Sequence, residues 1–174
     1  QDAPGRVGLP GGYVASMLLD RRGRLWVAGF GAGVRVMDTA QAPGAPPQVR
    51  RITLAEGLPH NGVDALVLAP DGDVWASTDG GLAHIHQDSL RVRRLLASDG
   101  VGIASYWTSA GALSADGMLL FGGTGGLTIV DPRQTATPAA PAPLVVTEVR
   151  LGDVRAAVPH QPPGQDAADV LTLE

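Results

Sequence analysis

The sequence contains no cysteine, and this absence excludes several kinds of site. Without a thiol there is no disulfide framework, no thiolate nucleophile and no metal site that uses cysteine. The net charge is −4, from 13 basic and 17 acidic residues, so no basic surface indicates a nucleic-acid partner. The longest apolar runs, such as residues 14–19, are far too short for a membrane-spanning helix.

Motifs for catalysis and for cofactors are missing as well. The Gly-rich residues 122–126 lack the Lys-Ser/Thr of a P-loop, and neither Gly-x-Ser-x-Gly nor His-Glu-x-x-His occurs. His84 and His86 alternate along one predicted strand, a spacing that can hold a metal, but a third ligand is missing and a solvated strand face is the better interpretation. We therefore expect no catalytic residue, no metal and no cofactor in this chain.

Glycine and proline, in contrast, are abundant, with 24 and 14 of the 174 residues. They follow no collagen-like period, so they indicate turns between many short strands. Hydrophobic residues make up 44% and charged residues 17% of the sequence, which is typical of a globular chain. No segment has a helical periodicity of useful length, and an all-β fold follows.

A repeat of roughly 45 to 49 residues organises most of the chain. Gly-Leu-Pro occurs at residues 8–10 and again at residues 57–59. The pair Trp26 and Trp75 marks a second matched position, and their recurrence indicates a core role between repeats. A third, weaker copy carries Asp-Gly and Gly-Gly pairs within residues 116–126, where tight turns need a positive φ.

Each copy predicts short antiparallel strands, and four strands per unit of this length form the blade of a β-propeller. We predict a partial β-propeller over residues 1–134, with three four-stranded blade repeats near residues 8–56, 57–98 and 99–132. Three blades are too few to close a propeller, so either further blades precede Gln1, which we favour, or copies of the chain assemble through their open edges. For the isolated chain, we expect self-association or marginal stability. The predicted strands cover residues 14–19, 25–30, 34–37 and 49–54 in the first copy and residues 63–69, 74–78, 82–86 and 90–96 in the second.

The C-terminal part has a different composition. Residues 135–143 form a Pro/Ala linker that is too stiff and polar for a core element. Residues 144–152 then predict a strand, and residues 154–158 and 170–173 predict two more. We expect a second, separate β-domain to begin over residues 144–174.

The repeat resembles a known family. Gly-Leu-Pro-x-x-x-Val at residues 57–63, Asp-x-x-Gly-x-Leu-Trp at residues 20–26 and Gly-Gly-Leu at residues 80–82 resemble the two-component regulator propeller repeat. Residues 116–132 lack both Gly-Leu-Pro and tryptophan, and resemble the closing repeat of that family, with a Phe-Gly-Gly core and a final Asp-Pro. Residues 144–174 resemble the first strands of the immunoglobulin-like triple-tyrosine (YYY) β-sandwich that follows such propellers.

The resemblance implies the periplasmic, extracytoplasmic ligand-sensing region of an inner-membrane protein, a bacterial two-component histidine kinase or a GGDEF-type regulator. It implies a small-molecule or oligosaccharide ligand, with the remaining blades and the β-sandwich of the full-length protein as partners. It also implies a homodimer in the intact sensor, and no nucleic acid in this region. Two alternatives stay open, which are a secreted propeller enzyme acting on polysaccharide and a non-catalytic protein-interaction scaffold.

Candidate ligand-binding residues lie on the loops that we expect to share one face of the blades. Tyr106 and Trp107 offer flat aromatic surfaces that suit a sugar ring, although packing between blades is the commoner use of such residues. His60 and Asn61 can hydrogen-bond a ligand, but a polar turn beside Gly62 is the simpler interpretation.

Overall fold

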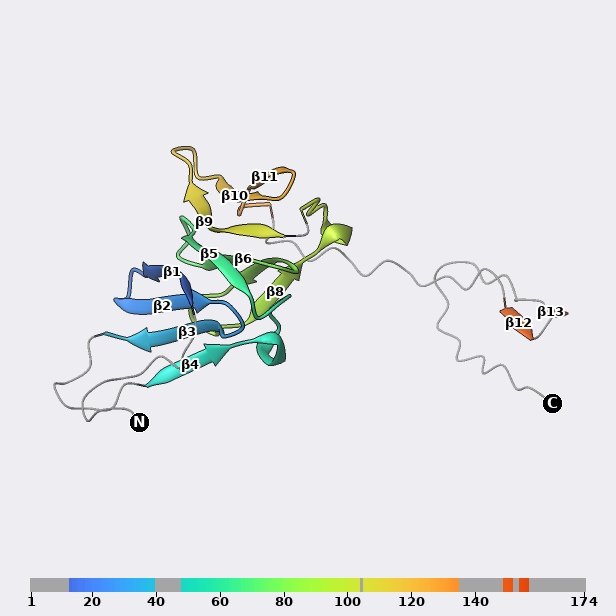
Figure 1. Cartoon of the computed structure of the whole chain (residues 1–174), viewed down its shortest axis with the longest axis horizontal. Coiled ribbons are helices and arrows are strands. Elements are labelled where there is room, and N and C mark those ends of the chain that lie inside the picture. Colours follow the sequence, from blue (N-terminus) through green and yellow to red (C-terminus); the bar gives the residue numbers. More distant parts are fainter. Residues whose placement is uncertain (1–12, 40–47, 104, 135–148, 152–153, 157–174) are drawn as a thin grey trace. The chain divides into compact units, whose positions relative to one another are not determined.

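The structure is a computed structural model that describes residues 13–39, 48–103, 105–134, 149–151 and 154–156 (Figure 1). The chain divides into two compact units, residues 1–136 and residues 137–174. In the first unit, the described residues form three antiparallel sheets in chain order, and in each sheet every strand pairs with the next one along the chain. This up-and-down order is that of propeller blades, and it confirms the predicted fold class.

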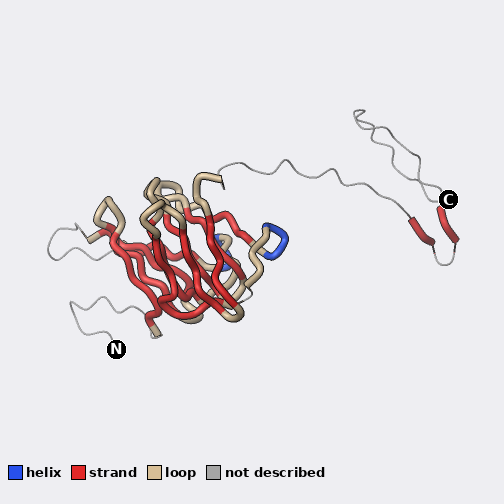
Figure 2. The backbone as a smooth tube through the Cα atoms, turned by 90° about the horizontal axis from the view of Figure 1, so that it is seen from above, coloured by secondary structure: helices blue, strands red, loops and turns tan. Residues whose placement is uncertain are grey.

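The first two blades have four strands each within the described residues. The third has three there, so the predicted fourth strand of that repeat is not found in the described part of the chain. Figure 2 shows the strands of this unit running side by side, with turns at their ends. Blade 1 consists of β1 (Val14–Leu19), β2 (Arg24–Gly29), β3 (Gly33–Asp38) and β4 (Val49–Ile52), blade 2 of β5 (Val63–Leu68), β6 (Val74–Thr78), β7 (Gly81–Ile85) and β8 (Val92–Leu95), and blade 3 of β9 (Tyr106–Leu113), β10 (Leu119–Gly123) and β11 (Gly126–Val130).

The end of β4 shows why one predicted strand is too long. The predicted strand runs to residue 54, but Thr53 is the N-cap of a 3₁₀ turn, η1 (Leu54–Glu56). The Thr53 side chain accepts a hydrogen bond from the Ala55 amide at 3.2 Å, and the Glu56 carboxylate accepts one from the Thr53 amide at 2.8 Å. This is a capping box, in which both side chains satisfy otherwise unpaired backbone donors. A second 3₁₀ turn, η2 (Ala97–Asp99), follows β8; there the Asp99 carboxylate accepts a hydrogen bond from the Leu96 amide at 2.8 Å, but the Leu96 side chain accepts none.

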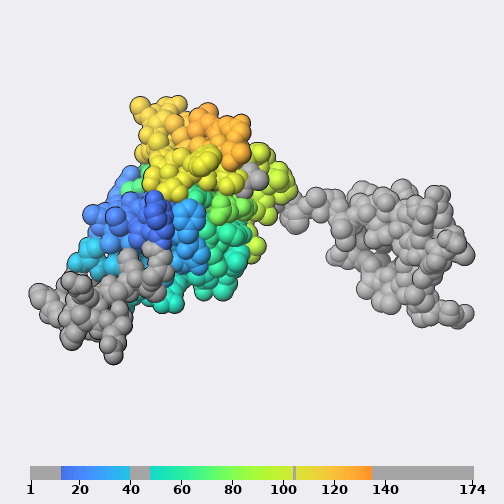
Figure 3. All heavy atoms as spheres, in the orientation of Figure 1, coloured from blue at the N-terminus to red at the C-terminus, as the bar shows by residue number. Residues whose placement is uncertain are grey.

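The hydrophobic core lies between the blades rather than within them. One cluster joins blades 1 and 2 around Trp26, and another joins blades 2 and 3 around Trp75. Both tryptophans are fully buried, which confirms their predicted packing role. Figure 3 shows blade 3, yellow to orange, lying directly against blade 2. The first strands of the three blades meet, because β5 contacts both β1 and β9.

The second unit contains one described element, an antiparallel hairpin of β12 (Val149–Leu151) and β13 (Val154–Ala156). These strands fall inside the predicted strands 144–152 and 154–158. The predicted linker, residues 135–143, and the predicted strand 170–173 lie outside the described residues, so the immunoglobulin-like domain stays a prediction. Among the described residues, no helix has the length and apolar character that crossing a membrane requires.

Candidate functional site: the loop face of the three blades

The turns after the second and fourth strands lie on one face of the blades, as predicted from the alternation of turns. We call this surface the loop face; within the described residues it comprises residues 29–33, 57–62, 78–81, 102–103, 105–107 and 123–126. Backbone hydrogen bonds connect the turns of blades 1 and 2 to one another and the two turns of blade 3 to each other, and the Ser105 and Asp79 side chains link the two groups. The bonds run from Gly33 N to Asn61 O (2.9 Å), from Asp79 N to Gly62 O (3.2 Å) and from Thr124 N to Ser105 O (2.9 Å).

The first strand of each blade, which we call the inner strand, carries a β-bulge where it reaches the loop face. In β1 the pairing skips Ala15, and in β5 it skips Asp64 at the corresponding place. In β9 the irregularity is larger, since residues 107–110 face a single residue of β10, Gly122. Bulges re-aim side chains without ending the sheet, and they are frequent next to functional sites. The Ser109 hydroxyl in the largest bulge donates to the Ala15 carbonyl at 2.7 Å, which connects blade 3 to blade 1.

Asp64 is the most unusual side chain of this surface. It is 1% exposed, and its Oδ2 atom has no hydrogen-bond partner among the described residues. Burial raises the pKa of Asp64 to about 6, and the negative charge of Asp79 acts in the same direction, while His60 lowers the pKa. A carboxyl group left in this state is costly to the fold and is characteristic of sites that bind or react.

Asp64 lines a cavity of about 260 Å³ that opens on the loop face, which we call the acidic cavity. All three blades contribute to it, and it brings two carboxyl groups next to aromatic side chains. Asp79 also accepts a hydrogen bond from the Ser105 hydroxyl at 3.4 Å, which links blades 2 and 3 at the cavity wall. The lining residues are Phe30, Asp64, Asp79, Ser105, Tyr106, Trp107, Thr108 and Thr124.

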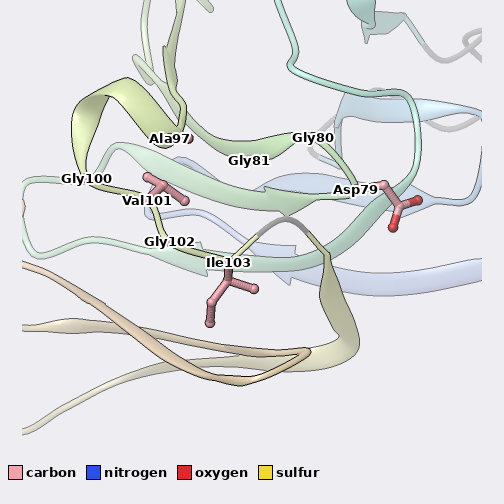
Figure 4. Close-up of a pocket in the computed structure, with 8 residues that line it drawn as sticks. All are labelled: Asp79, Gly80, Gly81, Ala97, Gly100, Val101, Gly102 and Ile103. Carbon is pink, nitrogen blue, oxygen red and sulfur yellow. The ribbon is translucent and has the colours of Figure 1, made fainter.

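A second cavity adjoins the first, because Asp79 lines both. We call it the apolar cavity; its volume is about 470 Å³. Figure 4 shows the side chains of Val101 and Ile103 on one part of its wall and Asp79 at the other end, with glycine backbone between. The complete lining is Asp79, Gly80, Gly81, Ala97, Gly100, Val101, Gly102 and Ile103.

The four predicted ligand residues have different surroundings. Trp107 is 62% exposed and lines the acidic cavity, so it is available to a ligand. His60 is exposed, and its Nδ1 accepts a hydrogen bond from the Gly62 amide at 2.9 Å and lies 3.5 Å from Asp79 Oδ2. It therefore lies beside the acidic cavity without being one of its lining residues.

Tyr106 and Asn61 are engaged in the protein itself. The Tyr106 ring packs edge-on against Phe121, and its hydroxyl is 2.9 Å from the Thr128 hydroxyl. Burial raises the pKa of Tyr106, against a smaller lowering by that hydrogen bond. Asn61 Oδ1 accepts a hydrogen bond from the Leu54 amide at 2.9 Å, so this side chain connects η1 to the loop face. Tyr106 also belongs to the buried cluster that joins blades 2 and 3, so packing between blades describes this residue, and turn formation describes Asn61.

Sequence reasoning missed the carboxyl groups of the cavity. Asp64 stands inside the apolar run Val63–Leu68, and a lone charged residue in a buried strand was the available signal. Asp79 follows a predicted strand directly and resembles an ordinary turn residue, so its role is visible only in three dimensions.

The two histidines of β7 and its following turn do not act as a pair. His84 Nε2 lies 2.7 Å from Asp73 Oδ2, and its ring stacks on Trp75 with a centroid distance of 4.7 Å. His86 instead accepts hydrogen bonds through Nδ1 from the amides of Asp88 and Ser89. Within the part of the chain that the structure describes, no group of three His, Cys, Asp or Glu side chains is placed to hold a metal ion.

Comparisons with known proteins agree with this architecture. Residues 8–31 match the family model described as two component regulator propeller. This segment contains the Gly-Leu-Pro tripeptide and Trp26, the residues that mark the repeat. No curated protein matches the chain significantly in sequence.

Two of the solved structures that match this chain are extracellular domains with the same fold. One is named as the extracellular domain of a hybrid two component system, BT3049, from B. thetaiotaomicron; it is 24% identical with a TM-score of 0.65, and the match covers 80% of this chain and 18% of that chain. The other is named as the extracellular domain of a one component system, BT4673, from the same organism, at 21% identity and a TM-score of 0.59, covering 70% of this chain and 17% of that chain. This chain therefore spans less than a fifth of the length of either structure.

Proposed function

We propose that this chain, which carries two-component regulator propeller repeats, belongs to the extracytoplasmic sensing region of a bacterial two-component sensor and binds a ligand on its loop face. The acidic cavity is the observation that carries the proposal. It joins residues of three blades, exposes Trp107 and contains a buried carboxyl group, Asp64, whose Oδ2 atom has no hydrogen-bond partner in the described part of the protein. A purely structural junction has no use for either feature.

The remainder of the sensor is part of the same proposal. The match covers 17–18% of two chains that are named as extracellular domains of regulatory systems, and this supports a longer protein with further blades and a completed β-sandwich. We place this region in the periplasm, anchored in the inner membrane and joined to a histidine kinase or a GGDEF-type output. The intact sensor is proposed to be a homodimer.

A ligand in the acidic cavity can change the relative placement of the blades, because it contacts residues of all three. Phe30 belongs to blade 1, Asp64 and Asp79 to blade 2, and Trp107 to blade 3. A molecule that contacts all of them favours one relative placement of the blades over others. Blade 3 precedes the C-terminal β-domain in the chain. A change in the relative placement of the blades is therefore passed to that domain through the segment that follows blade 3. Ligand binding is thus converted into a change in blade geometry, with no chemical step in this region.

The test is a thermal-shift screen of the full-length protein against oligosaccharides and small metabolites, with the kinase or cyclase output measured for each hit. A ligand that raises Tm and changes output, and that loses both effects in Trp107→Ala, is expected. Leu113→Ala is the matched control, because Leu113 lies on the same strand and is 45% exposed, but does not line the cavity.

Three other results would contradict the proposal. Turnover of a polysaccharide would identify a propeller enzyme. Absence of any ligand, together with stable capture of a protein partner, would identify a scaffold. A reading frame that ends soon after the β-sandwich, without a membrane span and output domain, would identify a secreted binding module.

A further inference from the structure

We propose that the loop face selects an organic cation, a protonated amine or quaternary ammonium with an apolar group. The charged centre would lie between Asp64, Asp79 and Trp107, and the apolar group would occupy the apolar cavity. This inference rests on the proposed ligand-binding function and specifies the chemical class of the ligand.

The charge distribution is the first argument. Two aspartates line the acidic cavity, and no arginine lines either this cavity or the apolar one. His60, the basic side chain nearest to Asp79, already uses Nδ1 as an acceptor for the Gly62 amide. The cavity walls are therefore acidic, and like charges close together in a sheltered site attract a compensating cation.

The state of Asp64 is the second and independent argument. Its side chain is almost fully buried, it lines the cavity, and its Oδ2 has no partner among the described residues. A buried carboxylate without a partner destabilises the fold, and an ammonium group placed against it removes that cost. A neutral sugar hydroxyl can donate a hydrogen bond here but leaves the charge uncompensated.

The aromatic wall favours an organic cation over a metal ion. Trp107 is 62% exposed and Phe30 is 44% exposed, and both line the acidic cavity. Aromatic faces attract ammonium groups, tryptophan most strongly, but give no ligand atom to a metal. In agreement, the described residues contain no set of three side chains arranged to hold a metal ion.

The apolar cavity adds a place for the apolar group of the ligand beside the charged groups. It begins at Asp79, which it shares with the acidic cavity, and continues along Gly80 and Gly81 to the side chains of Val101 and Ile103 (Figure 4). A volume of about 470 Å³ with this lining accommodates a short alkyl or aryl group. The two cavities together therefore fit a molecule with a cationic end and an apolar end.

The experiment uses four probes of equal chain length: hexylamine, hexyltrimethylammonium, hexan-1-ol and hexanoate. Acrylamide quenching of tryptophan emission is the readout, because Trp26 and Trp75 are 0% exposed whereas Trp107 is 62% exposed. We expect the two cations to protect Trp107 from quenching, the alcohol to protect it far more weakly and the carboxylate not to protect it.

Variants test the assignment of the site. Asp64→Asn and Asp79→Asn are each expected to weaken binding of the cations about tenfold or more, since each removes one charge partner. Asp88→Asn is the control, because Asp88 is exposed, pairs with Arg22 and lines neither cavity, and this variant should bind as the unmodified protein does.

Several results would overturn the inference. Equal protection by hexan-1-ol and the cations would indicate a purely apolar site, and protection by calcium or magnesium ions alone would indicate a metal site. If no cation binds but the screen of the full-length protein yields a neutral ligand, the inference fails and the sensing function stands. If neither experiment yields a ligand, both proposals fail.

Discussion

Blade 2 and the two blades beside it have the same type of sequence but a different environment. Blade 2 is covered on both faces, by the cluster around Trp26 on one side and the cluster around Trp75 on the other. Blades 1 and 3 are covered on one face each within the described residues, and each exposes apolar side chains such as Met17 (63%) and Ile129 (58%). Stability in this architecture therefore comes from contacts between neighbouring blades, as in other repeat proteins.

A single repeat position illustrates the difference. Leu82 and Leu127 both follow a Gly-Gly pair and both lie in the third strand of their blade. Leu82 is fully buried, whereas Leu127 is 55% exposed. The same residue at the same place in the repeat is thus a core residue or a surface residue, depending on whether another blade covers it.

The largest expected effect on stability comes from substituting these two equivalent leucines separately. Leu82→Ala should lower the free energy of unfolding by about 2–5 kcal/mol, because it opens a cavity between blades 2 and 3. Leu127→Ala in the same chain should change it by less than about 0.5 kcal/mol. Urea unfolding followed by circular dichroism measures both, and similar losses for the two variants would show that blade 3 is covered in solution.

The inner-strand bulges provide the next comparison, because Asp64 in blade 2 occupies the place of Ala15 in blade 1. The pKa of Asp64 is raised to about 6, so its folded state binds a proton more tightly than its unfolded state. The stability linked to this group is present at low pH and is lost as the pH rises from about 4 through about 6. Asp64→Asn should therefore stabilise the protein by about 2–3 kcal/mol at pH 8 and have little effect at pH 4.

Unfolding by urea at both pH values checks this, with Asp88→Asn as the exposed control. A destabilised Asp64→Asn variant at pH 8 would mean that the carboxylate is compensated in solution.

The two repeat tryptophans allow a smaller test of polar contacts. Trp26 Nε1 donates to Asp20 at 2.9 Å, whereas Trp75 Nε1 is buried without a partner among the described residues. Burial raises the pKa of Asp20, but the hydrogen bonds from Trp26 and Arg24 outweigh it and the pKa is lowered. Asp20→Ala makes blade 1 resemble blade 2, where Ala69 stands at that place, and should cost about 1–3 kcal/mol at neutral pH.

Part of that cost should disappear in acid. The stability linked to Asp20 is lost as the pH falls below the pKa that this carboxyl group has in the unfolded chain. Urea unfolding of Asp20→Ala at neutral and acidic pH measures it. No loss at neutral pH would show that the indole and guanidinium donors are as well satisfied by water.

Substitutions on the exposed faces of blades 1 and 3 should have the smallest effect on stability, but they should change the oligomeric state. We predict that the isolated chain self-associates through the open sides of blades 1 and 3, as unpaired blades tend to do. The double variant Met17→Asp, Ile129→Asp should shift sedimentation to the monomer while changing the unfolding free energy little. A chain that is already monomeric before substitution would contradict this prediction.

Most strands and turns could be predicted from the sequence, because the repeat period and the turn-forming residues indicate the same strand boundaries. β1 and β6 have the predicted bounds, and Gly72 and Gly117 adopt the positive φ expected of their Asp-Gly turns, at 97° and 87°. The grouping of the loops on one face also followed from the alternation of turns. The capping box that begins at Thr53 was readable as Thr-x-x-Glu, and overlooking it extended β4 by two residues.

The proposed site was only partly predictable from the sequence. Trp107 was predicted because an aromatic residue in a loop is conspicuous, whereas Asp64 was not singled out, although it is a lone charged residue in the apolar run Val63–Leu68. The bulge, the burial of Asp64 and the approach of Asp79 are tertiary properties that no local pattern of residues contains.

Because a bulged residue makes no pairing with the neighbouring strand, its identity is free of the constraints that hold the sheet together. Ala15, Asp64 and Trp107 occupy this place in successive blades and are respectively small, acidic and aromatic. Under the proposed function, ligand selectivity and strand pairing would therefore rest on different residues. A propeller of this kind can acquire a new specificity by single substitutions, one blade at a time, while every strand keeps its partner.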